Sequence, residues 1–497
     1  MDALFNTAQI RAIETAAAAG LPGGTLMHRA GRAATEAALG IAGPPAGAAV
    51  LVLAGPGNNG GDGLEVAANL AELGAEVTVV QLGSAEERSP EAHHALLRAQ
   101  AAGAVLTAAL PPGRFALVVD AMFGIGLARP LAGRAAELAA YASAADCPVL
   151  ALDVPSGLDA ETGAVVGPAG TAVMATHTVT FIGDKPGLHT GDGKAHAGEV
   201  IVASLGIAPD MFPEPAARIN APALFAGHLR PRGVNSHKGS FGNVAVVGGA
   251  RGMSGAPLLA SRAALLGGAG RVFAVFLDDG PALDPGQPEL MCRAAAGFDY
   301  ASATIVAGPG LGTSPDAVHV LLRAFDSASP LVLDADAFNL LATSPDLQQR
   351  LAARGNAVLT PHPLEAARML GMTSAIVQAD RMAAAHELAK RFNAAVILKG
   401  AGSVIAHGDA IVINPTGNPG LATAGSGDVL AGLCGSLLAQ GWPVPEAALG
   451  ATWIHGQAAD ELVAQGAGPI GLTAGELPVA ARRVLNGLVG RSGQRRL

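Results

Sequence analysis

Short apolar runs alternate with helical stretches along most of the chain, and this alternation constrains the fold more than any other feature. In the first part, such runs end near Ala54, Leu82, Ala121 and Pro155. Strands that alternate with helices form a mostly parallel sheet, which helices cover on both faces. The sequence therefore predicts an α/β fold. The helical stretches are expected near residues 7–19, 24–39, 61–73, 90–101 and 131–145.

A second series of strands begins after a proline-rich, strand-poor stretch, GIAPDMFPEPAARINAPALF. Its runs include NVAVVGG, RVFAVFL, ATIVAGPG, LVLDADA, NAVLTPH, AAVILKG, SVIAHG and AIVINPTG, and a largely helical tail begins near Gly425. A chain of 497 residues is also too long for one ordinary domain. We therefore expect two α/β units in tandem, residues 1–215 and 216–497.

Charge and cysteine content exclude several classes of protein. The net charge is −9 and no Lys/Arg block is interleaved with aromatic residues, which argues against a nucleic-acid groove. Cys147, Cys292 and Cys434 lie far apart, so neither a disulfide framework nor a cysteine metal site is expected. No run is long enough to span a bilayer, and the N-terminus lacks a signal-peptide pattern. We expect a soluble cytoplasmic protein that binds small molecules and has no nucleic-acid or membrane partner.

The segment GPGNNGGDG, residues 55–63, follows an apolar run and matches the dinucleotide-binding pattern G-x-G-x-x-G. A dinucleotide-binding fold also needs an acidic residue at the end of the second strand, where it holds the ribose hydroxyls. That strand, VTVVQLG, ends in Gln81, Leu82 and Gly83 instead. The glycine pattern alone is therefore a weak indication of a dehydrogenase.

Polar side chains follow three strands of the first unit. Because ligands of parallel sheets lie beyond the carboxyl ends of strands, these side chains predict a site. Asparagine and aspartate also satisfy turns, but three such groups at successive strand ends favour a site. A set of one amide, one carboxylate, one hydroxyl and backbone carbonyls suits a monovalent cation. The polar residues are Asn58, Asn59, Asp62, Asp120, Asp153 and Ser156.

GPGNNGGDG, VDAMFGIG and DVPSGLD, in this order, resemble the NAD(P)H-hydrate epimerase family, the YjeF N-terminal domain, over about residues 1–210. The resemblance implies a Rossmann-like αβα sandwich that binds a hydrated nicotinamide dinucleotide and epimerises C6 of its ring. One departure is His28, where the family pattern leads us to expect Glu or Gln.

The same resemblance implies roles for individual residues. Asp153 is expected to contact the ring and to act as the acid or base. Potassium is expected to be bound by Asn59, Asp120 and Ser156. Other substrate contacts are expected from Asn58, Asn59, Gly60, Gly61 and Asp62, and from a phosphate-binding loop of Gly124, Ile125, Gly126, Leu127, Ala128, Arg129 and Pro130.

The richest stretch of the second unit is NPTGNPGLATAGSGDVLAGLCGSLLAQG, in which AGSGD runs into an apolar helix. Glycines at a helix start expose free N–H groups, and the helix dipole favours anions there. Asp428 lies in the first turn. It is either an ordinary helix cap or a base that accepts a hydroxyl proton beside a phosphate cradle. The long Gly/Thr/Asn lead-in favours the second interpretation.

This stretch resembles the ribokinase superfamily and, more closely, the ADP/ATP-dependent NAD(P)H-hydrate dehydratases, the YjeF C-terminal domain. KGSFGNVAVVGGARGMSGAPLLA, AGPGLG, LDADAFN, TPHPLEAARML, ILKGAGSVI and GNPGLATAGSGDVLAG fit in order over about residues 237–440. The resemblance implies a ribokinase-like αβα domain that uses ADP with magnesium, with Asp428 as the base. His362 could instead order a proline-flanked turn, and Lys399 could be an ordinary strand-end lysine. Implied substrate contacts are Ala256, Gly310, His362 and Asp428, and implied nucleotide contacts are Lys399, Gly400, Ala401, Gly402, Ser403 and Gly427.

Three hypotheses follow. The first is a bifunctional repair enzyme whose first domain interconverts the R and S hydrates and whose second dehydrates the S form with ADP. The second is a ribokinase-like kinase of a small molecule, such as a vitamin, with an accessory dinucleotide-binding domain. The third is a non-enzymatic nucleotide sensor or scaffold. Because units of this kind often assemble, we also expect a homo-oligomer.

Overall fold

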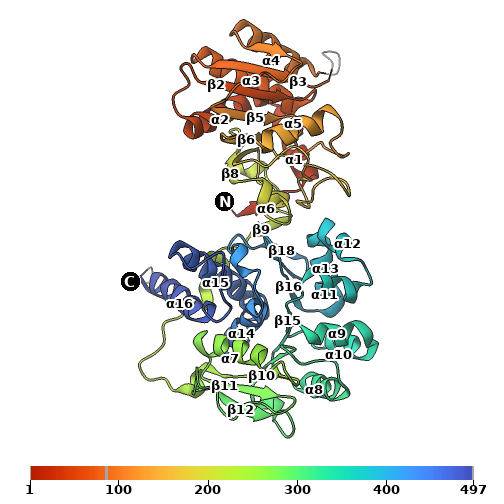
Figure 1. The fold of residues 1–497 in the computed structure, drawn as a ribbon, viewed down its shortest axis with the longest axis vertical. Helices are drawn as coiled ribbons and strands as arrows, with labels where there is room; N and C mark the ends of the chain where they lie inside the picture. Colours follow the sequence, from red (N-terminus) through yellow and green to blue (C-terminus); the bar gives the residue numbers. More distant parts are fainter. Residues whose placement is uncertain (1, 84–87, 495–497) are drawn as a thin grey trace. The chain divides into compact units, whose positions relative to one another are not determined.

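The computed structural model describes residues 2–83 and 88–494, and the chain divides into two compact units, Ala3–Arg218 and Ile219–Leu497 (Figure 1). Strands and helices alternate in both units, which confirms the α/β fold expected from the sequence. Each unit builds its own sheet and its own buried core.

The first unit contains a parallel sheet in the order β4-β3-β2-β5-β6-β7-β8. Numbered from β2, this is the strand order 3-2-1-4-5-6-7, which extends the Rossmann order 3-2-1-4-5-6 by one strand. Its strands are β2 (Ala49–Ala54), β3 (Glu76–Gln81), β4 (Val105–Thr107), β5 (Leu117–Ala121), β6 (Val149–Leu152), β7 (His177–Phe181) and β8 (Glu199–Ala203). Its helices are α1 (Thr7–Ala18), α2 (Thr25–Ala42), α3 (Asn58–Glu72), α4 (Pro90–Ala101), α5 (Arg134–Ser143) and α6 (Gly193–His196).

Strand β2 shows how this sheet is buried on both faces. Val50 and Val52 pack into the core formed with α1 to α4, whereas Leu51 and Leu53 pack into the core formed with α5. Alternate side chains of a strand point to opposite faces, so a strand between two helical layers must be apolar throughout. This is the physical reason for the apolar run in the sequence.

Two short strands lie outside this sheet. Strand β1 (Ala3–Leu4) pairs antiparallel with β9 (Ala217–Ile219), so residues from the two ends of the first unit lie side by side.

The second unit contains a sheet whose strands run β18-β17-β16-β15-β14-β13-β10-β11-β12. The strands from β12 to β16 are parallel, and β17 and β18 pair antiparallel. They are β10 (Asn243–Gly248), β11 (Arg271–Phe276), β12 (Met291–Ala294), β13 (Thr304–Ala307), β14 (Leu331–Leu333), β15 (Ala357–Leu359), β16 (Ala395–Leu398), β17 (Val404–His407) and β18 (Ala410–Ile413).

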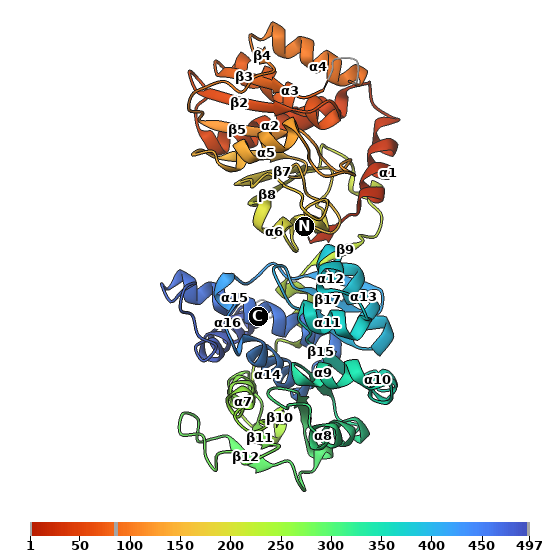
Figure 2. The ribbon, with the colours of Figure 1, turned by 45° about the vertical axis from the view of Figure 1, so that its right-hand side comes forward.

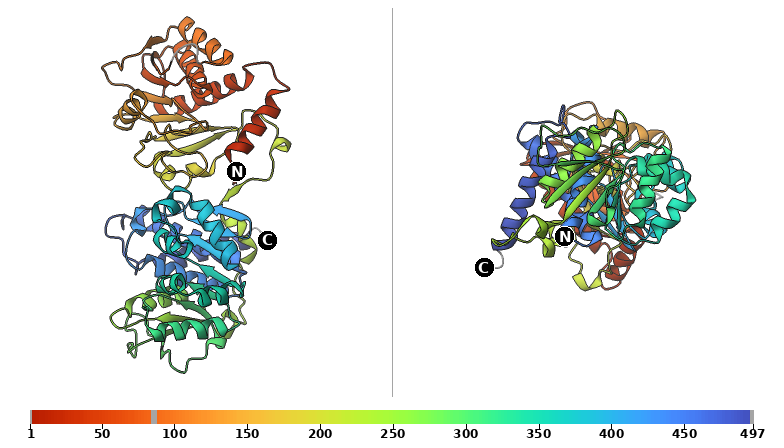
Figure 3. Two further views of the ribbon diagram at one scale, coloured as in Figure 1. Left: turned by 90° about the vertical axis from the view of Figure 1, so that its right-hand side faces the viewer. Right: turned by 90° about the horizontal axis from the view of Figure 1, so that it is seen from below.

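Helices cover both faces of this sheet, and Figure 2 shows the two layers on opposite sides of the strands. One layer packs with Val244 and Val246, and the other packs with Ala245 and Val247. The first layer is α7 (Gly255–Leu266), α14 (Ser426–Ala439), α15 (Val444–Ala464) and α16 (Leu477–Gln494), and the dark-blue α16 lies at its outer edge (Figure 3). The second is α8 (Pro315–Asp326), α9 (Asp336–Thr343), α10 (Pro345–Ala352), α11 (Pro363–Leu370), α12 (Ser374–Ala379) and α13 (Arg381–Phe392).

Two boundaries differ from expectation in a way that matters for function. Helix α3 begins already at Asn58, so the asparagines of GPGNNGGDG form the first helical turn rather than a loop before it. Strand β6 ends at Leu152, so Asp153 lies just beyond the strand. The polar groups of Asn58, Asn59 and Asp153 therefore lie at the carboxyl edge of the sheet.

Candidate active sites

The first unit contains a cavity of about 610 Å³ at the carboxyl edge of β2, β5 and β6. This is where the strand order reverses between β2 and β5, the place at which ligands bind to open parallel sheets. Gly60, Gly61, Ala128, Arg129 and Pro130 do not line this cavity. The sequence-predicted residues that do line it are Asn58, Asn59, Asp62, Gly124, Ile125, Gly126, Leu127 and Asp153.

Asp153 is held in a fixed orientation at the cavity wall. Its backbone has a positive φ of 67°, which is uncommon for a residue with a side chain. The backbone N–H of Ile125 donates to Oδ2 at 3.0 Å. A Cβ on Gly124 would lie only 2.5 Å from this same oxygen, so the loop can approach Asp153 only with glycine at this position.

Lys185 lies beneath Asp153 and is completely buried. Its ammonium group donates to Oδ1 of Asp153 at 2.7 Å, to Oγ1 of Thr180 at 2.6 Å and to the carbonyl of Phe181 at 2.8 Å. A buried ammonium group is stable only when its charge and all its donors are matched in this way. Lys185 therefore supplies a fixed positive charge behind the Asp153 carboxylate.

Asp120 and Ser156 form a buried pair beside the cavity. Oγ of Ser156 donates to Asp120 at 2.6 Å, and the backbone N–H of Ser156 donates to the second carboxylate oxygen at 2.8 Å. Burial raises the pKa of Asp120 to about 6 even though these hydrogen bonds lower it. Both side-chain polar atoms of Asn59 are buried and have no hydrogen-bond partner. A buried amide left in this state is costly unless a ligand satisfies it.

Two further carboxyl groups line the cavity. Burial raises the pKa of Asp62 well above its usual value, and the neighbouring carboxylates of Asp153, Glu14 and Glu65 raise it further. The pKa of Glu14, on α1, is also raised, first by burial and then by Asp153. The cavity therefore contains carboxyl groups in unlike surroundings, because Lys185 is bonded to Asp153.

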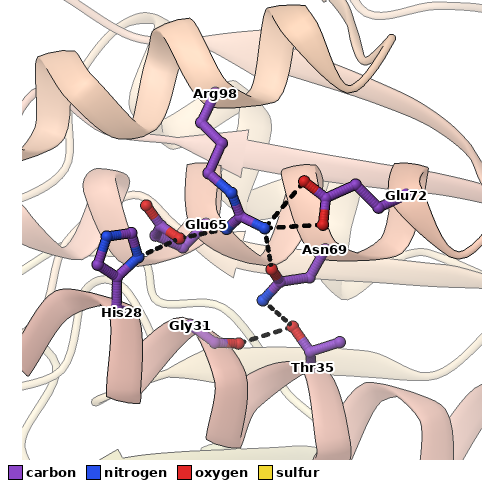
Figure 4. Close-up of polar contacts among 7 residues, drawn as sticks. All are labelled: His28, Gly31, Thr35, Glu65, Asn69, Glu72 and Arg98. Carbon is purple, nitrogen blue, oxygen red and sulfur yellow. Dashed lines mark hydrogen bonds and ion pairs between the residues drawn. The ribbon is translucent and has the colours of Figure 1, made fainter. Parts of the chain in front are cut away.

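A polar network behind α3 accounts for His28 (Figure 4). Nδ1 of His28 lies 2.9 Å from Oε2 of the buried Glu65, which also accepts from Arg98 at 2.5 Å. Arg98 further donates to Asn69, which in turn donates to Thr35. His28 thus links α2 to α3 and does not line the cavity.

The second unit places Asp428 in the first turn of α14. Gly425 caps the helix with a φ of 90° and without a side-chain hydrogen bond. Burial raises the pKa of Asp428 to about 7, and the nearby carboxylate of Asp334 contributes to the rise. An aspartate with this pKa can both accept and release a proton near neutral pH.

Lys399 and Asp334 form an ion pair directly under this turn. Their Nζ and Oδ1 atoms lie 2.7 Å apart, and Oδ1 also accepts from Oγ1 of Thr360. A Cβ on Gly427 would lie 3.2 Å from Nζ of Lys399, so glycine leaves that charge close to the helix start. Burial alone would lower the pKa of Lys399, but neighbouring carboxylates, that of Asp334 first, outweigh it and raise the pKa.

His362 caps α11 with Nδ1, which accepts from the backbone N–H groups of Leu364 and Glu365 at 3.1 and 3.2 Å. Burial lowers its pKa, and the charge of Lys399 lowers it further. The imidazole therefore orders the proline-flanked turn, and its half-exposed ring also lies within the electrostatic reach of Lys399.

The other sequence-predicted residues of the second unit form two groups. A Cβ on Gly310 would lie 3.4 Å from that of Ala256, so these two positions are neighbours. The loop from Lys399 to Ser403 is closed by Oγ of Ser403, which donates to the carbonyl of Gly400. Buried Arg381 lies against Gly400 and supports this loop from below.

Sequence reasoning missed Lys185 and Asp334. Asp334 follows the apolar run LVL, so its position at a strand end was a usable signal. Lys185 comes four residues after Phe181, the last residue of β7, and lies below the cavity rather than on its wall, so the pattern of strand ends did not reveal it.

Within residues 2–83 and 88–494, no helix is long and apolar enough to cross a membrane. The same residues contain no group of three or more His, Cys, Asp or Glu side chains arranged to hold a metal ion.

Comparisons with known proteins match both units. A family model described as YjeF-related protein N-terminus matches residues 23–187, and one described as NAD(P)H-hydrate dehydratase matches residues 244–477. The bifunctional NAD(P)H-hydrate repair enzyme of Coxiella burnetii is 38% identical over 98% of this chain and 100% of its own length. The ADP-dependent (S)-NAD(P)H-hydrate dehydratase of Neisseria meningitidis is 49% identical over 52% of this chain and 90% of its own length.

A crystal structure of the ADP/ATP-dependent NAD(P)H-hydrate dehydratase from Bacillus subtilis, co-crystallised with ATP and Mg²⁺, is also similar. It is 29% identical, covers 54% of this chain and 98% of its own, and superposes with a TM-score of 0.48.

Proposed function

The chain belongs to the family of bifunctional NAD(P)H-hydrate repair enzymes, and from this membership we infer which residues carry its two reactions. It is a repair enzyme with an epimerase unit first and an ADP-dependent dehydratase unit second. The strongest support for this function is the full-length match to a bifunctional relative. A vitamin kinase with an accessory domain, or a scaffold with relict sites, leaves that match unexplained.

In the first unit, the cavity between β2, β5 and β6 is the binding site for the hydrated dinucleotide. A volume of about 610 Å³ falls within the range of small-molecule sites. The first turn of α3 exposes N–H groups beside Asn58 and Asn59, which suits the negative charge of the substrate's phosphates. Asp153 faces this space from β6 and is the acid or base that acts at C6.

Potassium binds beside this cavity through Asn59, Asp120 and Ser156. The support is the buried amide of Asn59, whose polar atoms have no partner among the residues that the structure describes. The carboxylate of Asp120 is buried and its hydrogen-bond donors come from Ser156 and Met122, so this side of the cavity carries net negative charge. Oxygen ligands with a single carboxylate suit a monovalent ion. The ion would neutralise Asp120 and fix the turn that holds Ser156.

In the second unit, Asp428 is the base and the N-terminus of α14 is the phosphate site. The backbone N–H of Gly427 and the positive end of the helix dipole stabilise the transferring phosphoryl group. Lys399 adds a positive charge next to Gly427. The loop from Lys399 to Ser403 contacts the adenine nucleotide, whereas Ala256, Gly310 and His362 contact the hydrated dinucleotide.

The reaction at C6 then follows from the positions of these groups. Asp428 accepts the proton of the C6 hydroxyl, whose oxygen bonds to the terminal phosphorus of ADP as the bond to AMP breaks. Phosphate is a far better leaving group than hydroxide. It departs as the ring nitrogen donates its electron pair, and loss of a ring proton restores the dihydronicotinamide.

Magnesium with ADP neutralises charge on the nucleotide phosphates. The ion would be bound mainly by the nucleotide phosphates rather than by a set of protein ligands, because Asp334 is already bonded to Lys399. Magnesium is commonly bound through substrate phosphates with few protein ligands.

A direct assay tests both activities. Purified protein is mixed with each epimer of hydrated NADH or NADPH and with ADP or ATP. We expect the absorbance of the reduced nicotinamide to return, with AMP and phosphate formed from ADP, and both epimers to be consumed. Nucleotide consumed only with an unrelated alcohol would instead support the kinase hypothesis, and binding without turnover would support the scaffold.

We also propose that the enzyme works in the cytoplasm, where its substrates are used, and that it forms a homo-oligomer. Light scattering coupled to size exclusion measures the mass in solution, and a mass near that of one 49.0 kDa chain would contradict the second point.

A further inference from the structure

The cavity of the first unit holds two carboxyl groups that face it from different strands. Asp62 is the fifth residue of α3, which follows β2, and Asp153 follows β6. Strand β5 separates β2 from β6, and the side chains of both residues line the same cavity. Both carboxyl groups can therefore reach a ring that is bound there.

Asp153 is ion-paired and held in one orientation. One oxygen accepts from the ammonium group of Lys185 and the other accepts from the backbone N–H of Ile125. The remaining donors of Lys185 go to Thr180 and to the carbonyl of Phe181, so the lysine cannot turn toward another acid without losing them. Both oxygens of Asp153 therefore have fixed hydrogen-bond donors.

Asp62 has the opposite surroundings. Among the described residues it accepts no hydrogen bond, and it faces the carboxyl groups of Asp153, Glu14 and Glu65. The ammonium group of Lys185 is bonded to Asp153 and so does not pair with Asp62.

The nearby arginines act on the other two acids. Arg98 is bonded to Glu65, and the charge of Arg11 acts on Glu14. These surroundings favour the neutral carboxyl form of Asp62, and its raised pKa agrees. Two carboxyl groups of one site in unlike surroundings are a common arrangement for an acid and a base.

We propose that Asp62 is the proton donor and Asp153 the proton acceptor of the epimerisation, and that Lys185 is the positioning residue that holds Asp153 through their ion pair. The assignment rests on the epimerase function proposed above and adds the acid, the base and the route.

Each proton is accounted for. The carboxyl group of Asp62 protonates the C6 hydroxyl, the C6–O bond breaks, and the electron pair of the ring nitrogen forms a C=N⁺ bond as water leaves. A second water then attacks C6 from the opposite face, Asp153 takes its proton, and the electron pair returns to nitrogen. The ring now carries the inverted hydroxyl. Exchange with solvent returns Asp62 to the acid and Asp153 to the carboxylate.

The first experiment measures R-to-S conversion chromatographically without nucleotide, so that the dehydratase stays silent. Wild-type conversion no faster than the spontaneous rate would refute the epimerase function itself. With an active wild type, we expect kcat/KM to rise and then fall with pH. Asp62→Asn should lower kcat at least 100-fold with a small change in KM. Wild-type kcat in this variant would overturn the role of Asp62.

Lys185 is tested by the split between kcat and KM. Lys185→Met should lower kcat at least 10-fold with a small change in KM, because Asp153 loses the ion pair that orients it, and Lys185→Arg should restore kcat. An unchanged kcat in Lys185→Met overturns the positioning role. A thermal unfolding scan of each variant identifies those that do not fold, and Lys185→Arg then carries the test.

The second experiment tests the route with wild-type enzyme in H₂¹⁸O. Because a solvent water replaces the hydroxyl, each inversion should add one ¹⁸O atom to the hydrate. Inversion without label would mean that the C6–O bond stays intact and would overturn the route.

Discussion

The ammonium group of Lys399 lies 2.7 Å from Oδ1 of Asp334, next to Gly427, the second residue of α14. Asp334 is 2% exposed and the side chain of Lys399 is 21% exposed, so the carboxylate is almost removed from water and the lysine only partly. The pair places a positive charge beneath the proposed phosphate site while its carboxylate acts on Asp428. The pair therefore links the stability of the second unit to the pH at which its base works.

Replacement of Lys399 by methionine should affect both properties. A buried Asp334 left unpaired costs about 3–5 kcal/mol of unfolding free energy. Lys399 also lowers the pKa of Asp428, so its loss moves the dehydratase pH profile to higher pH. Denaturant unfolding and pH–rate profiles measure the two effects. The double variant Lys399→Met, Asp334→Asn should regain most of the stability. No regain would show that the pair is not the cause.

Asp428→Asn should abolish ADP-dependent dehydration and leave epimerisation unchanged, because the two sites use different residues. In the wild type, the pKa of Asp428 is raised to about 7, so the proton-accepting form is lost as pH falls through 7. Dehydration should therefore slow below pH 7 with a slope of one proton. A rate independent of pH between 5 and 8 would contradict Asp428 as the base.

Asp153→Asn should leave repair of the S hydrate unchanged, whereas the R hydrate should disappear only as fast as it epimerises spontaneously. Asparagine keeps the size of the side chain but cannot accept the proton. The S hydrate assayed with the same preparation is the internal control. Undiminished turnover of the R hydrate would remove Asp153 from the mechanism.

Potassium should raise the unfolding temperature of the first unit and sodium should do so less. A ligand at 100 times its Kd stabilises the folded state by about 2.7 kcal/mol. Asn59→Ala removes the buried amide and should abolish the potassium effect, whereas Asn58→Ala, at an exposed position, should keep it. Equal shifts in both variants would mean that the ion binds elsewhere.

Gly31 and Gly40 lie on the same helix, α2, and should respond oppositely to alanine. A Cβ on Gly31 would lie 2.3 Å from Cβ of Glu65, so Gly31→Ala should destabilise the unit by about 1–3 kcal/mol through overpacking (Figure 4). A Cβ on Gly40 would meet no described atom within 4 Å outside its own stretch of helix, so Gly40→Ala should stabilise the helix by about 0.5–1 kcal/mol. Chemical denaturation measures both, and a stabilising Gly31→Ala would contradict the close packing of α2 on α3.

The two parallel sheets could be predicted because a strand buried on both faces must be continuously apolar, as β2 is. Asp120 and Asp153 could be predicted because each directly follows or ends such a run. Lys185 could not, because its function depends on a fold that brings it beneath a residue 32 positions away. His28 could be seen as unusual, but its partner Glu65 is buried on another helix, which no local pattern reveals.

The strand order of the first sheet has a consequence for synthesis on the ribosome. Strand β2 pairs with β3 on one edge, but its other partner, β5, begins only at Leu117. Synthesis proceeds at about 5–20 residues per second, so one apolar edge of β2 stays unpaired for several seconds until that partner is translated. During this interval the nascent chain exposes VLVLA with no covering strand, which makes it a target for holding chaperones. Slower codons placed between β3 and β5 would lengthen this exposure and lower the soluble yield.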